Sequence, residues 1–288
     1  MDAKGAPFAG SNALIFGGAK GIGQAVALEF ARRGARVAIA DIDQDAARDT
    51  AGAIVAQGGH AIGLHANVLS DDSVADAATA SEAQLGEIDI VVNNVGSMLN
   101  GHPEDIPMAE WQRMMDLNYF STIRSLKLFL PKFLARGRGH IVNTASFAGL
   151  YPYAASRMPY VASKGAMIAL TQSLAIYLEP KGIRVSCLIP GPVMTGIMAS
   201  MTSWTPDCPM RGPGSELEIK DVEETALALA DGMRDGKIMI SSDEKVWDIV
   251  RRWAASPDAF IRSKIEEFSR GDAGSPRMPE ALKRKLGV

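Results

Sequence analysis

Three side chains in the middle of the chain have the types and spacing that proton transfer requires. Tyr160 and Lys164 are four residues apart, and Ser146 precedes the tyrosine by fourteen residues. Positions i and i+4 of a helix share one face, so we expect the phenol and the ammonium to be neighbours. A nearby positive charge favours the phenolate and lowers the pKa of a tyrosine. The pattern therefore predicts a tyrosine that works as general acid and base near neutral pH.

A second pair with the same spacing, Tyr177 and Lys181, shows that spacing alone is weak support for chemistry. Pro180 stands inside this second pair. Proline predicts that the helix ends there. We interpret Tyr177 and Lys181 as a surface pair.

A glycine-rich turn near the N-terminus follows the order of elements that binds a dinucleotide. The apolar residues 13–16 predict a buried strand, which leads into Gly17, Gly21 and Gly23 and then a helical pattern over 21–33. Glycines let the backbone approach a pyrophosphate, and a helix N-terminus offers free N–H groups and a partial positive charge. The turn is therefore a candidate phosphate-binding loop.

An acidic residue after the second predicted strand favours one cofactor over another. The strand over 36–40 ends in Asp41, eighteen positions after Gly23. A carboxylate at this place accepts hydrogen bonds from the ribose hydroxyls of adenosine and repels a 2′-phosphate. NAD is the predicted cofactor. Lys20, which could reach a 2′-phosphate, keeps NADP as the less favoured alternative.

The glycine spacing G-x-x-x-G-x-G, together with five further motifs, resembles the short-chain dehydrogenase/reductase family in its compact subgroup. The resemblance covers about residues 10 to 196. Its motifs are, in chain order, Gly17-x-x-x-Gly21-Ile22-Gly23, Asn93-Asn94-Val95-Gly96, Asn118, Asn143-Thr144-Ala145-Ser146, Tyr160-Val161-Ala162-Ser163-Lys164 and Pro190-Gly191-Pro192-Val193-Met194-Thr195.

The resemblance implies four catalytic residues. Ser146 would stabilise the charge on the substrate oxygen, and Tyr160 would exchange the proton on that oxygen. Lys164 would hold the nicotinamide ribose and lower the pKa of Tyr160. Asn118 would hold a water that links Lys164 to solvent.

The resemblance also implies a set of cofactor contacts. In the last motif, the backbone at Val193 and the hydroxyl of Thr195 would hold the carboxamide. The full predicted set is Gly17, Lys20, Gly21, Ile22, Gly23, Asp41, Ile42, Asn67, Val68, Asn94, Val95, Gly96, Tyr160, Lys164, Pro190, Gly191, Val193 and Thr195.

Several positions depart from the family pattern without removing a catalytic group. Asn67 stands where an aspartate usually contacts adenine, and its carbonyl oxygen can still accept a hydrogen bond. Val95 replaces a common alanine, and Ser186 replaces an asparagine. The interval from Ser146 to Tyr160 is one residue longer than usual.

Alternating strand and helix patterns predict the fold class. Strands are expected near 13–16, 36–40, 61–65, 88–92, 139–145, 184–188 and 237–241, and helices near 21–33, 44–57, 71–85, 108–134 and 160–178. This alternation predicts an α/β fold, a Rossmann-type doubly wound parallel sheet, as a single domain over 1–288. A substrate lid is expected at about 196–216 and a C-terminal helical extension at about 243–288, with the tail 271–288 partly disordered.

Large apolar residues are expected to ring the substrate cleft. They predict a bulky, hydrophobic secondary alcohol or its ketone, such as a steroid, terpenoid or aromatic alcohol. The alternative is that these residues serve core packing or contacts between subunits. The residues are Met98, Leu99, Tyr151, Tyr153, Met158, Ile197, Met198, Met201, Trp204, Pro206, Pro209, Met210 and Pro213.

Composition excludes some function classes. The 288 residues carry a net charge of −3, which gives no basic footprint for nucleic acid. We expect no membrane span, no secretory signal and no disulfide framework from the two cysteines, and therefore a cytoplasmic protein. The histidines His60, His65, His102 and His140 lack metal-ligand spacing, so we interpret them as surface or loop residues and predict no metal.

Two function classes follow from these residues. The first is an NAD-dependent alcohol dehydrogenase or ketoreductase. The second is a catalytically silent dinucleotide-binding regulatory or scaffolding protein. The family resemblance implies a homodimer or homotetramer that pairs through the helices at 108–134 and 160–178. The C-terminal extension is either a cover that borders the substrate entrance or a subunit contact, or a set of extra helices that pack on the sheet edge.

Overall fold

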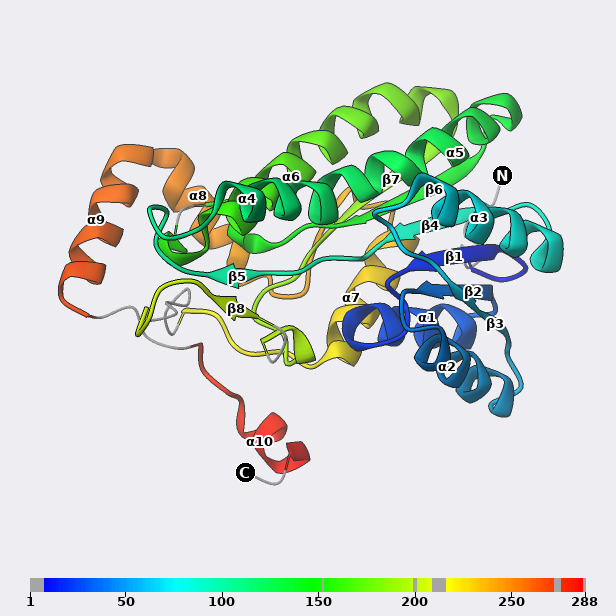
Figure 1. Cartoon of the computed structure of the whole chain (residues 1–288), viewed down its shortest axis with the longest axis horizontal. Coiled ribbons are helices and arrows are strands. Elements are labelled where there is room, and N and C mark those ends of the chain that lie inside the picture. The colour runs from blue at the N-terminus through cyan, green and yellow to red at the C-terminus, as the bar shows by residue number, and fades with distance from the viewer. Residues whose placement is uncertain (1–7, 152, 199–200, 209–215, 272–275, 287–288) are drawn as a thin grey trace.

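The computed structural model describes residues 8–151, 153–198, 201–208, 216–271 and 276–286. Seven parallel strands form its main sheet, in the order β3-β2-β1-β4-β6-β7-β9 (Figure 1). The chain runs outward from β1 to β3 and then returns to β4 on the other side of β1, which is the doubly wound arrangement. The predicted α/β class with a Rossmann-type parallel sheet is confirmed. The strands are β1 (Asn12–Phe16), β2 (Arg36–Asp41), β3 (His60–His65), β4 (Ile90–Asn93), β6 (Gly139–Thr144), β7 (Ile183–Ile189) and β9 (Met239–Ser241).

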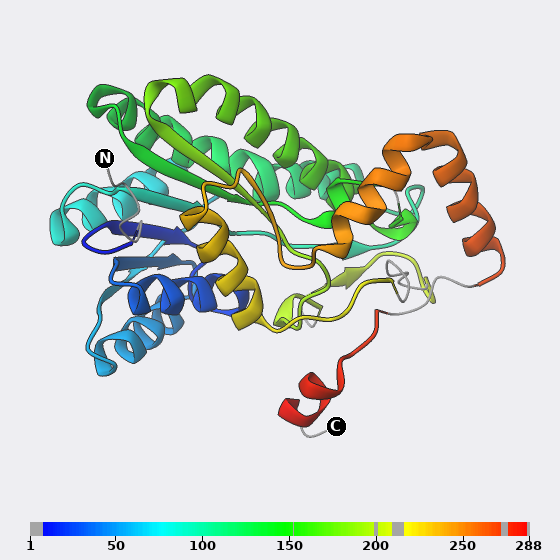
Figure 2. The same cartoon turned by 180° about the vertical axis from the view of Figure 1, so that it is seen from behind.

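Helices cover both faces of the sheet because successive strand residues point to opposite sides. Ile15 pairs with Ile39 and Val92, and all three are buried beneath α1, α2 and α7. Leu14 pairs with Val91, and both are buried beneath α3, α5 and α6. Figure 2 shows α1 and α7 side by side on their face. The helices are α1 (Gly21–Arg32), α2 (Gln44–Ala56), α3 (Asp71–Leu85), α5 (Ser121–Arg136), α6 (Met158–Leu178) and α7 (Val222–Arg234).

Helix α7 was not expected from the sequence. It begins with a capping box in which the side chain of Asp221 accepts from the backbone of Glu224, and the side chain of Glu224 reaches back to the backbone of Asp221. Its buried face, with Leu229 and Met233, completes the cluster over β1 and β2. The Asp-x-x-Glu spacing was a signal of this helix in the sequence.

The long middle helix contains a wider turn at a functional position. The segment expected to be helical over 108–134 forms α4 (Met108–Met115), a π-helical turn (Asp116–Phe120) and α5. Such turns are rare and often mark functional sites. Asn118, predicted to be catalytic, lies in this π turn.

Part of the predicted lid is tied to the loop after β4. Two short strands, β5 (Leu99–Asn100) and β8 (Thr202–Ser203), pair in parallel as a second sheet. The hydroxyl of Thr205 donates to Asp105 at 2.7 Å and accepts from the backbone of His102 at 2.8 Å. Residues 199–200 and 209–215 of the lid lie outside the described residues.

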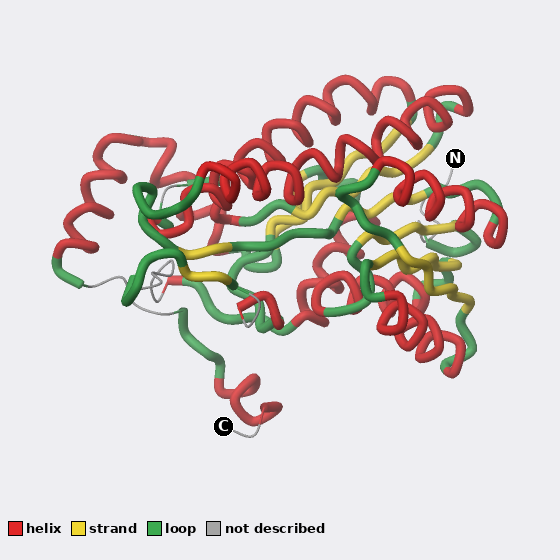
Figure 3. Tube along the Cα trace, in the orientation of Figure 1, coloured by secondary structure: helices red, strands yellow, loops and turns green. Residues whose placement is uncertain are grey.

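The loops that leave the carboxyl edge of the main sheet run toward the C-terminal helices (Figure 3). These helices are α8 (Lys245–Ala255), α9 (Pro257–Ser269) and α10 (Glu280–Leu286). Part of the tail that was predicted to be partly disordered is helical: in α10, Leu282 is buried and Lys285 pairs with Asp221 and Glu223. Residues 272–275 and 287–288 lie outside the described part of the tail.

One described helix, within Ala155–Lys181, is long and apolar enough to cross a membrane by length and composition alone. A single helix of this kind is weak evidence for a membrane span, because a core helix has the same length and composition, and the expectation of no membrane span stays a prediction. Its apolar composition has a local reason, since α6 packs against β7 and buries Met167 and Ile168. The same helix carries the buried Lys164.

His140 corrects the interpretation of the histidines as surface or loop residues. It is buried in β6, and its Nε2 lies 2.9 Å from the hydroxyl of Ser186 in the neighbouring strand. Burial lowers the pKa of His140 to about 3. Ser186, noted as a departure from the family pattern, is thus the partner of a buried neutral histidine. Among the described residues, no group of three or more His, Cys, Asp or Glu side chains could hold a metal ion.

Candidate active site

The glycine-rich turn joins β1 to α1 and has a shape that fits a pyrophosphate. Gly17 and Gly21 have φ angles of +74° and +58°, in the left-handed region that favours glycine. A Cβ on Gly23 would lie 1.9 Å from the carbonyl oxygen of Gly17. Ile22 lies in the first turn of α1, and Lys20 at the N-cap makes no side-chain capping bond, which leaves N–H groups of this turn for a ligand. The turn therefore fits the phosphates of a dinucleotide.

Asp41 ends β2 and faces this turn. Its carboxylate accepts backbone hydrogen bonds from Ala19 and Asp43, both at 3.1 Å. Ile42 beside it is 68 % exposed. Lys20, the candidate for a 2′-phosphate contact, pairs instead with Asp43 at 2.6 Å.

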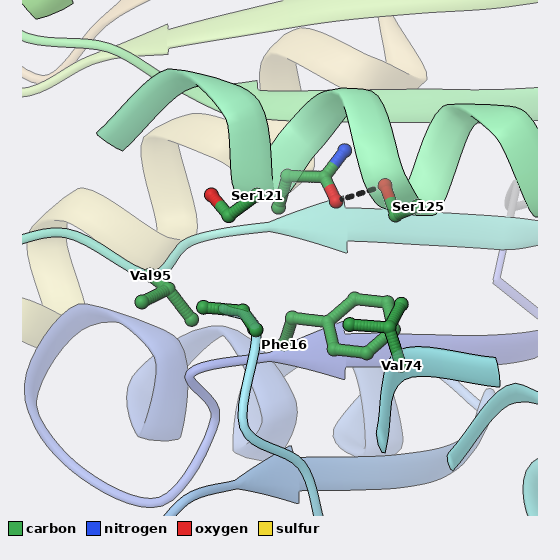
Figure 4. A pocket seen from close by; sticks show the side chains of 7 residues that line it. Phe16, Val74, Val95, Ser121 and Ser125 are labelled. Atoms are coloured by element: carbon green, nitrogen blue, oxygen red, sulfur yellow. Dashed lines mark hydrogen bonds between the residues drawn. The ribbon is translucent and has the colours of Figure 1, made fainter. Parts of the chain in front are cut away.

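The residues predicted to contact adenine follow β3. The side-chain oxygen of Asn67 accepts a hydrogen bond from the backbone of Leu69 at 3.1 Å, so it shapes the loop locally. Val68 lines a small pocket together with Val95 and Phe16 (Figure 4). Two residues predicted to bind the cofactor, from the loops after β3 and β4, thus line the same pocket.

Asn94 connects the glycine turn to the end of β6. Its side-chain nitrogen donates to the carbonyl of Gly17 at 3.0 Å, and its side-chain oxygen accepts from the hydroxyl of Thr144 at 3.1 Å. Beneath it, the side chains of Asn93 and Asn143 form a buried hydrogen bond of 2.9 Å between β4 and β6. The carboxyl ends of β1, β4 and β6 are therefore fixed relative to one another.

Asn118 joins the loop after β4 to α6. Its side-chain amide exchanges hydrogen bonds with the backbone of Ser97, at 2.9 and 3.0 Å, and donates to the hydroxyl of Ser163 at 2.9 Å. A Cβ on Gly96 would lie 3.3 Å from both the Asn118 oxygen and the Lys164 ammonium. The glycine therefore leaves space where these two groups approach.

Ser146, Tyr160 and Lys164 meet in one buried place. Ser146 follows β6, and the other two lie on the first turns of α6; their exposed fractions are 5 %, 8 % and 3 %. The Ser146 hydroxyl is hydrogen-bonded to the phenol of Tyr160. The ammonium of Lys164 donates to the carbonyl of Thr144 at 2.8 Å and lies 5.9 Å from the centroid of the Tyr160 ring. The structure brings the predicted phenol, hydroxyl and ammonium together.

Burial sets the protonation of this group. It lowers the pKa of Lys164 to about 8 and raises the pKa of Tyr160 above its ordinary value. The hydrogen bond from Ser146 and the positive charge of Arg157 act in the opposite direction on the Tyr160 pKa. We expected Lys164 to lower this pKa; in the chain by itself the lowering charge is that of Arg157, since the Lys164 ammonium is turned to a backbone carbonyl.

Sequence analysis did not single out Arg157. This side chain is only 7 % exposed and lies one helical turn before Tyr160. The signal in the sequence was its position three residues before the tyrosine, because residues i and i+3 are neighbours on a helix.

The segment after β7 returns to the glycine turn. A Cβ on Gly21 would lie 3.7 Å from Thr195. Pro190 accepts a backbone hydrogen bond of 3.1 Å from the turn after β6, and Gly191 donates to a serine hydroxyl after β9 at 3.1 Å. Val193 forms an isolated parallel β-bridge with Lys220, just before α7. The predicted carboxamide-binding segment thus lies between the phosphate-binding turn and the catalytic group.

The large apolar residues expected around the cleft fall into different environments. Met98, Tyr151 and Tyr153 are buried in one cluster with Tyr160, and Ile197 and Met201 pack against it. Leu99 is buried in a separate cluster, whereas Met158 and Trp204 are 38 % and 36 % exposed. The side chain of Met198 and residues Pro209, Met210 and Pro213 lie outside the described part of the chain.

The C-terminal helices pack against the cluster that contains Tyr160. Val246 and Ile249 of α8 and Phe260 of α9 are buried in it. The ring of Phe260 meets that of Tyr151 edge-on, with centroids 6.1 Å apart. These helices therefore contact the aromatic side of the candidate site, not only the sheet edge.

Comparison with known proteins agrees with this geometry. Residues 11–206 match the short chain dehydrogenase family. The 1-deoxy-11-beta-hydroxypentalenate dehydrogenase of Streptomyces exfoliatus is 33 % identical over 210 residues, which are 72 % of this chain and 74 % of the relative. The 7alpha-hydroxysteroid dehydrogenase of Escherichia coli (strain K12) is 33 % identical over 192 residues, 67 % of this chain and 74 % of the relative.

A solved structure is similar over most of the chain. A short chain dehydrogenase/reductase from Burkholderia phymatum, in complex with NAD, superimposes with a TM-score of 0.76 and 25 % identity, covering 88 % of this chain and 95 % of that one. The family match spans more than half of the chain, in the region that holds the glycine turn and Tyr160. The chain therefore belongs to the short chain dehydrogenase family of oxidoreductases, which bind a nicotinamide dinucleotide.

Proposed function

We propose that this chain is an NAD-dependent dehydrogenase or ketoreductase that acts on a bulky, hydrophobic secondary alcohol or its ketone. The observation that carries the proposal is the joint burial of Ser146, Tyr160 and Lys164 at the carboxyl edge of the sheet. The glycine turn, whose backbone fits a pyrophosphate, lies at the same edge.

When bound, the nicotinamide supplies the hydride acceptor or donor. Tyr160 exchanges the proton on the substrate oxygen, and the Ser146 hydroxyl donates a hydrogen bond to that oxygen. Lys164 holds the nicotinamide ribose with an ammonium that is protonated at neutral pH, since its pKa is about 8. Asn118 fixes the loop after β4 against α6 and holds a water beside Lys164.

The remaining predicted contacts orient the dinucleotide. Asp41 would bind the adenosine ribose, Val68 would contact the adenine, and Val193 with Thr195 would hold the carboxamide. The carboxylate at Asp41 disfavours a 2′-phosphate, and the pairing of Lys20 with Asp43 weakens the alternative for NADP.

The substrate class rests on the aromatic cluster beside Tyr160. Phe147, Tyr151 and Tyr153 are buried there, and Phe260 of α9 contacts Tyr151. Such a wall suits an apolar ring system. Two of the relatives above are named as dehydrogenases of a hydroxypentalenate and of a hydroxysteroid, which supports this substrate class.

The test is a titration with NAD and NADP, followed by a panel of secondary alcohols and ketones read at the absorbance of the reduced nicotinamide. We expect tighter binding of NAD and turnover of cyclic, apolar alcohols. Turnover of small polar polyols alone would contradict the substrate class, and preference for NADP would contradict the role of Asp41. Tight NAD binding without turnover of any member would favour the catalytically silent alternative.

We further propose a homo-oligomer that pairs through the helices of one face. Exposed apolar side chains lie on α6, with Ile176 80 % and Tyr177 52 % exposed, and in the π-helical turn before α5, with Phe120 48 % exposed. Light scattering of the parent and of Ile176→Glu tests this pairing, because a charge in a packed interface disfavours association. An unchanged molar mass in the variant would contradict it.

A further inference from the structure

Arg157 is a charged side chain buried at the beginning of α6. It is 7 % exposed, and its backbone N–H donates to the carbonyl of Ala154 at 3.1 Å. Its guanidinium lies 5.6 Å from the centroid of the Tyr153 ring, and the two side chains are hydrogen-bonded. Burying a guanidinium costs free energy, so its position calls for a compensating role.

The partner of Arg157 is itself held in place. The rings of Tyr153 and Phe147 are stacked, with centroids 4.8 Å apart and an interplanar angle of 14°. Phe147 directly follows Ser146, and Tyr151 packs against both rings. The guanidinium is thus tied, through two rings, to the backbone that carries the Ser146 hydroxyl.

The charge of Arg157 acts on the phenol that the mechanism uses. Burial raises the pKa of Tyr160, and Arg157 is the charged group that opposes this. Charges interact strongly where water is excluded. Arginine does not lose its proton in a protein, whereas burial lowers the pKa of Lys164 to about 8. Arg157 therefore stays positive at pH values where Lys164 becomes neutral.

Other titratable groups around Tyr160 come from several elements. Lys164 is on the same helix, Tyr153 is in the loop after β6, and Cys187 of β7 is near Lys164. Asp243, Glu216 and Arg252 act on Tyr151, beyond the aromatic rings. Among the described residues, Arg157 is the one permanently positive group whose charge acts on Tyr160 itself.

We propose that Arg157 is a positioning residue for the reaction: its permanent charge, oriented by Tyr153, stabilises the phenolate of Tyr160. This inference rests on the proposed role of Tyr160. It assigns to a second cation, on the aromatic side of the site, an effect that the family resemblance implies for Lys164.

The test is the pH profile of kcat/KM for alcohol oxidation in the parent, Arg157→Gln and Arg157→Lys. In this direction activity rises with pH as the phenol ionises. We expect Arg157→Gln to move this rise upward by about one pH unit, which lowers the rate near neutral pH about tenfold. Arg157→Lys should restore most of the shift. Lys181→Gln, in the exposed 3₁₀ turn that follows α6, should leave the profile unchanged.

A structural role gives a different result. If Arg157→Gln lowers the rate at every pH without moving the midpoint, the inference is wrong. Tyr153→Phe keeps the stacked ring but loses the hydrogen bond, so it should move the midpoint in the same direction by less. If Arg157→Gln does not fold, Tyr153→Phe carries the test instead. An unmoved midpoint in Tyr153→Phe would then overturn the proposal.

A readout without turnover separates this inference from the proposed function. The Cζ carbon of Tyr160, assigned by comparison with Tyr160→Phe, can be titrated by NMR in protein saturated with NAD. The titration midpoint should be higher in Arg157→Gln than in the parent. If no alcohol is oxidised but this difference is found, the proposed function fails and the electrostatic role of Arg157 stands.

Discussion

Two tyrosine–lysine pairs with the same spacing lie at opposite ends of α6, the second with Lys181 in the 3₁₀ turn (Glu179–Lys181) that follows the helix. Tyr160 and Lys164 are 8 % and 3 % exposed. Tyr177, at the other end of the helix, is 52 % exposed, and the ammonium of Lys181 lies 3.7 Å above its ring. Even the serine is repeated, since Ser163 precedes Tyr177 by fourteen residues, as Ser146 precedes Tyr160.

The difference shows that the sheet, and not the spacing, makes the first pair special. Seventeen residues of helix separate the two tyrosines by about 25 Å. The first pair lies where β6 ends, so Lys164 reaches the carbonyl of Thr144. At the second pair, Lys181 donates to the carbonyl of Tyr177 itself, a local bond at the exposed end of the helix. The exposure of Tyr177 and Lys181 confirms the prediction that they form a surface pair.

A large difference between the two pairs is expected when each lysine is replaced with methionine in turn. Lys164→Met should lower kcat/KM about a hundredfold or more, because it removes the buried ammonium that is proposed to hold the nicotinamide ribose. Lys181→Met should leave the rate unchanged. Steady-state kinetics at pH 7 checks both, and equal losses in the two variants would mean that burial does not separate the pairs.

Two carboxylates near the glycine turn differ in their partners. Asp41 accepts a backbone hydrogen bond from the turn, whereas Asp43 forms an exposed ion pair with Lys20. Asp41→Ser should shift the ratio of kcat/KM for NADP over NAD by about tenfold or more toward NADP, since a repulsion with the 2′-phosphate is removed. Asp43→Ser is the matched control and should shift the ratio less. A ratio that moves only in the control would place the ribose contact at the wrong carboxylate.

Burial also separates the histidines, with an effect on stability. Burial lowers the pKa of His140 from about 6.5 to about 3. Below pH 6.5 the imidazole therefore binds a proton in the unfolded chain but stays neutral in the folded chain. As a result, the free energy of unfolding falls as the pH falls between 6.5 and 3, by up to about 1.4 kcal/mol per pH unit. Stability from neutral His140 is fully present above pH 6.5.

Urea unfolding at pH 7.5 and pH 5.5 measures this loss. His140→Gln should be less stable than the parent at pH 7.5 but lose less stability at the lower pH. His65→Gln, at an exposed position of β3, should behave like the parent. An equal loss of stability in all three proteins would show that His140 is not the group that titrates.

Local signals made much of the fold and the candidate site predictable. The strand, glycine turn and helix from 13 to 33 depend on neighbouring residues, and β1, Gly17 and α1 are found where expected. Each catalytic candidate also had a position set by a motif. Their proximity then followed from the parallel sheet, whose strand ends share one edge.

What escaped prediction depends on contacts between distant segments. β5 and β8 are two residues each and exist because residues 99–100 meet residues 202–203. His140 is buried because Ser186 on the next strand accepts or donates its hydrogen bond. Arg157 has no family motif, and its role depends on the ring of Tyr153 folding back over it. Helix α7, by contrast, had a local signal, the capping box, that we did not use.

The most direct test of the central claim replaces each tyrosine of α6 with phenylalanine and measures NAD binding and hydride transfer separately. We predict that Tyr160→Phe binds NAD as the parent does but loses turnover by about a thousandfold, within the range for a lost general acid and base. Tyr177→Phe should keep both. Turnover retained in Tyr160→Phe, with NAD bound, would contradict the account.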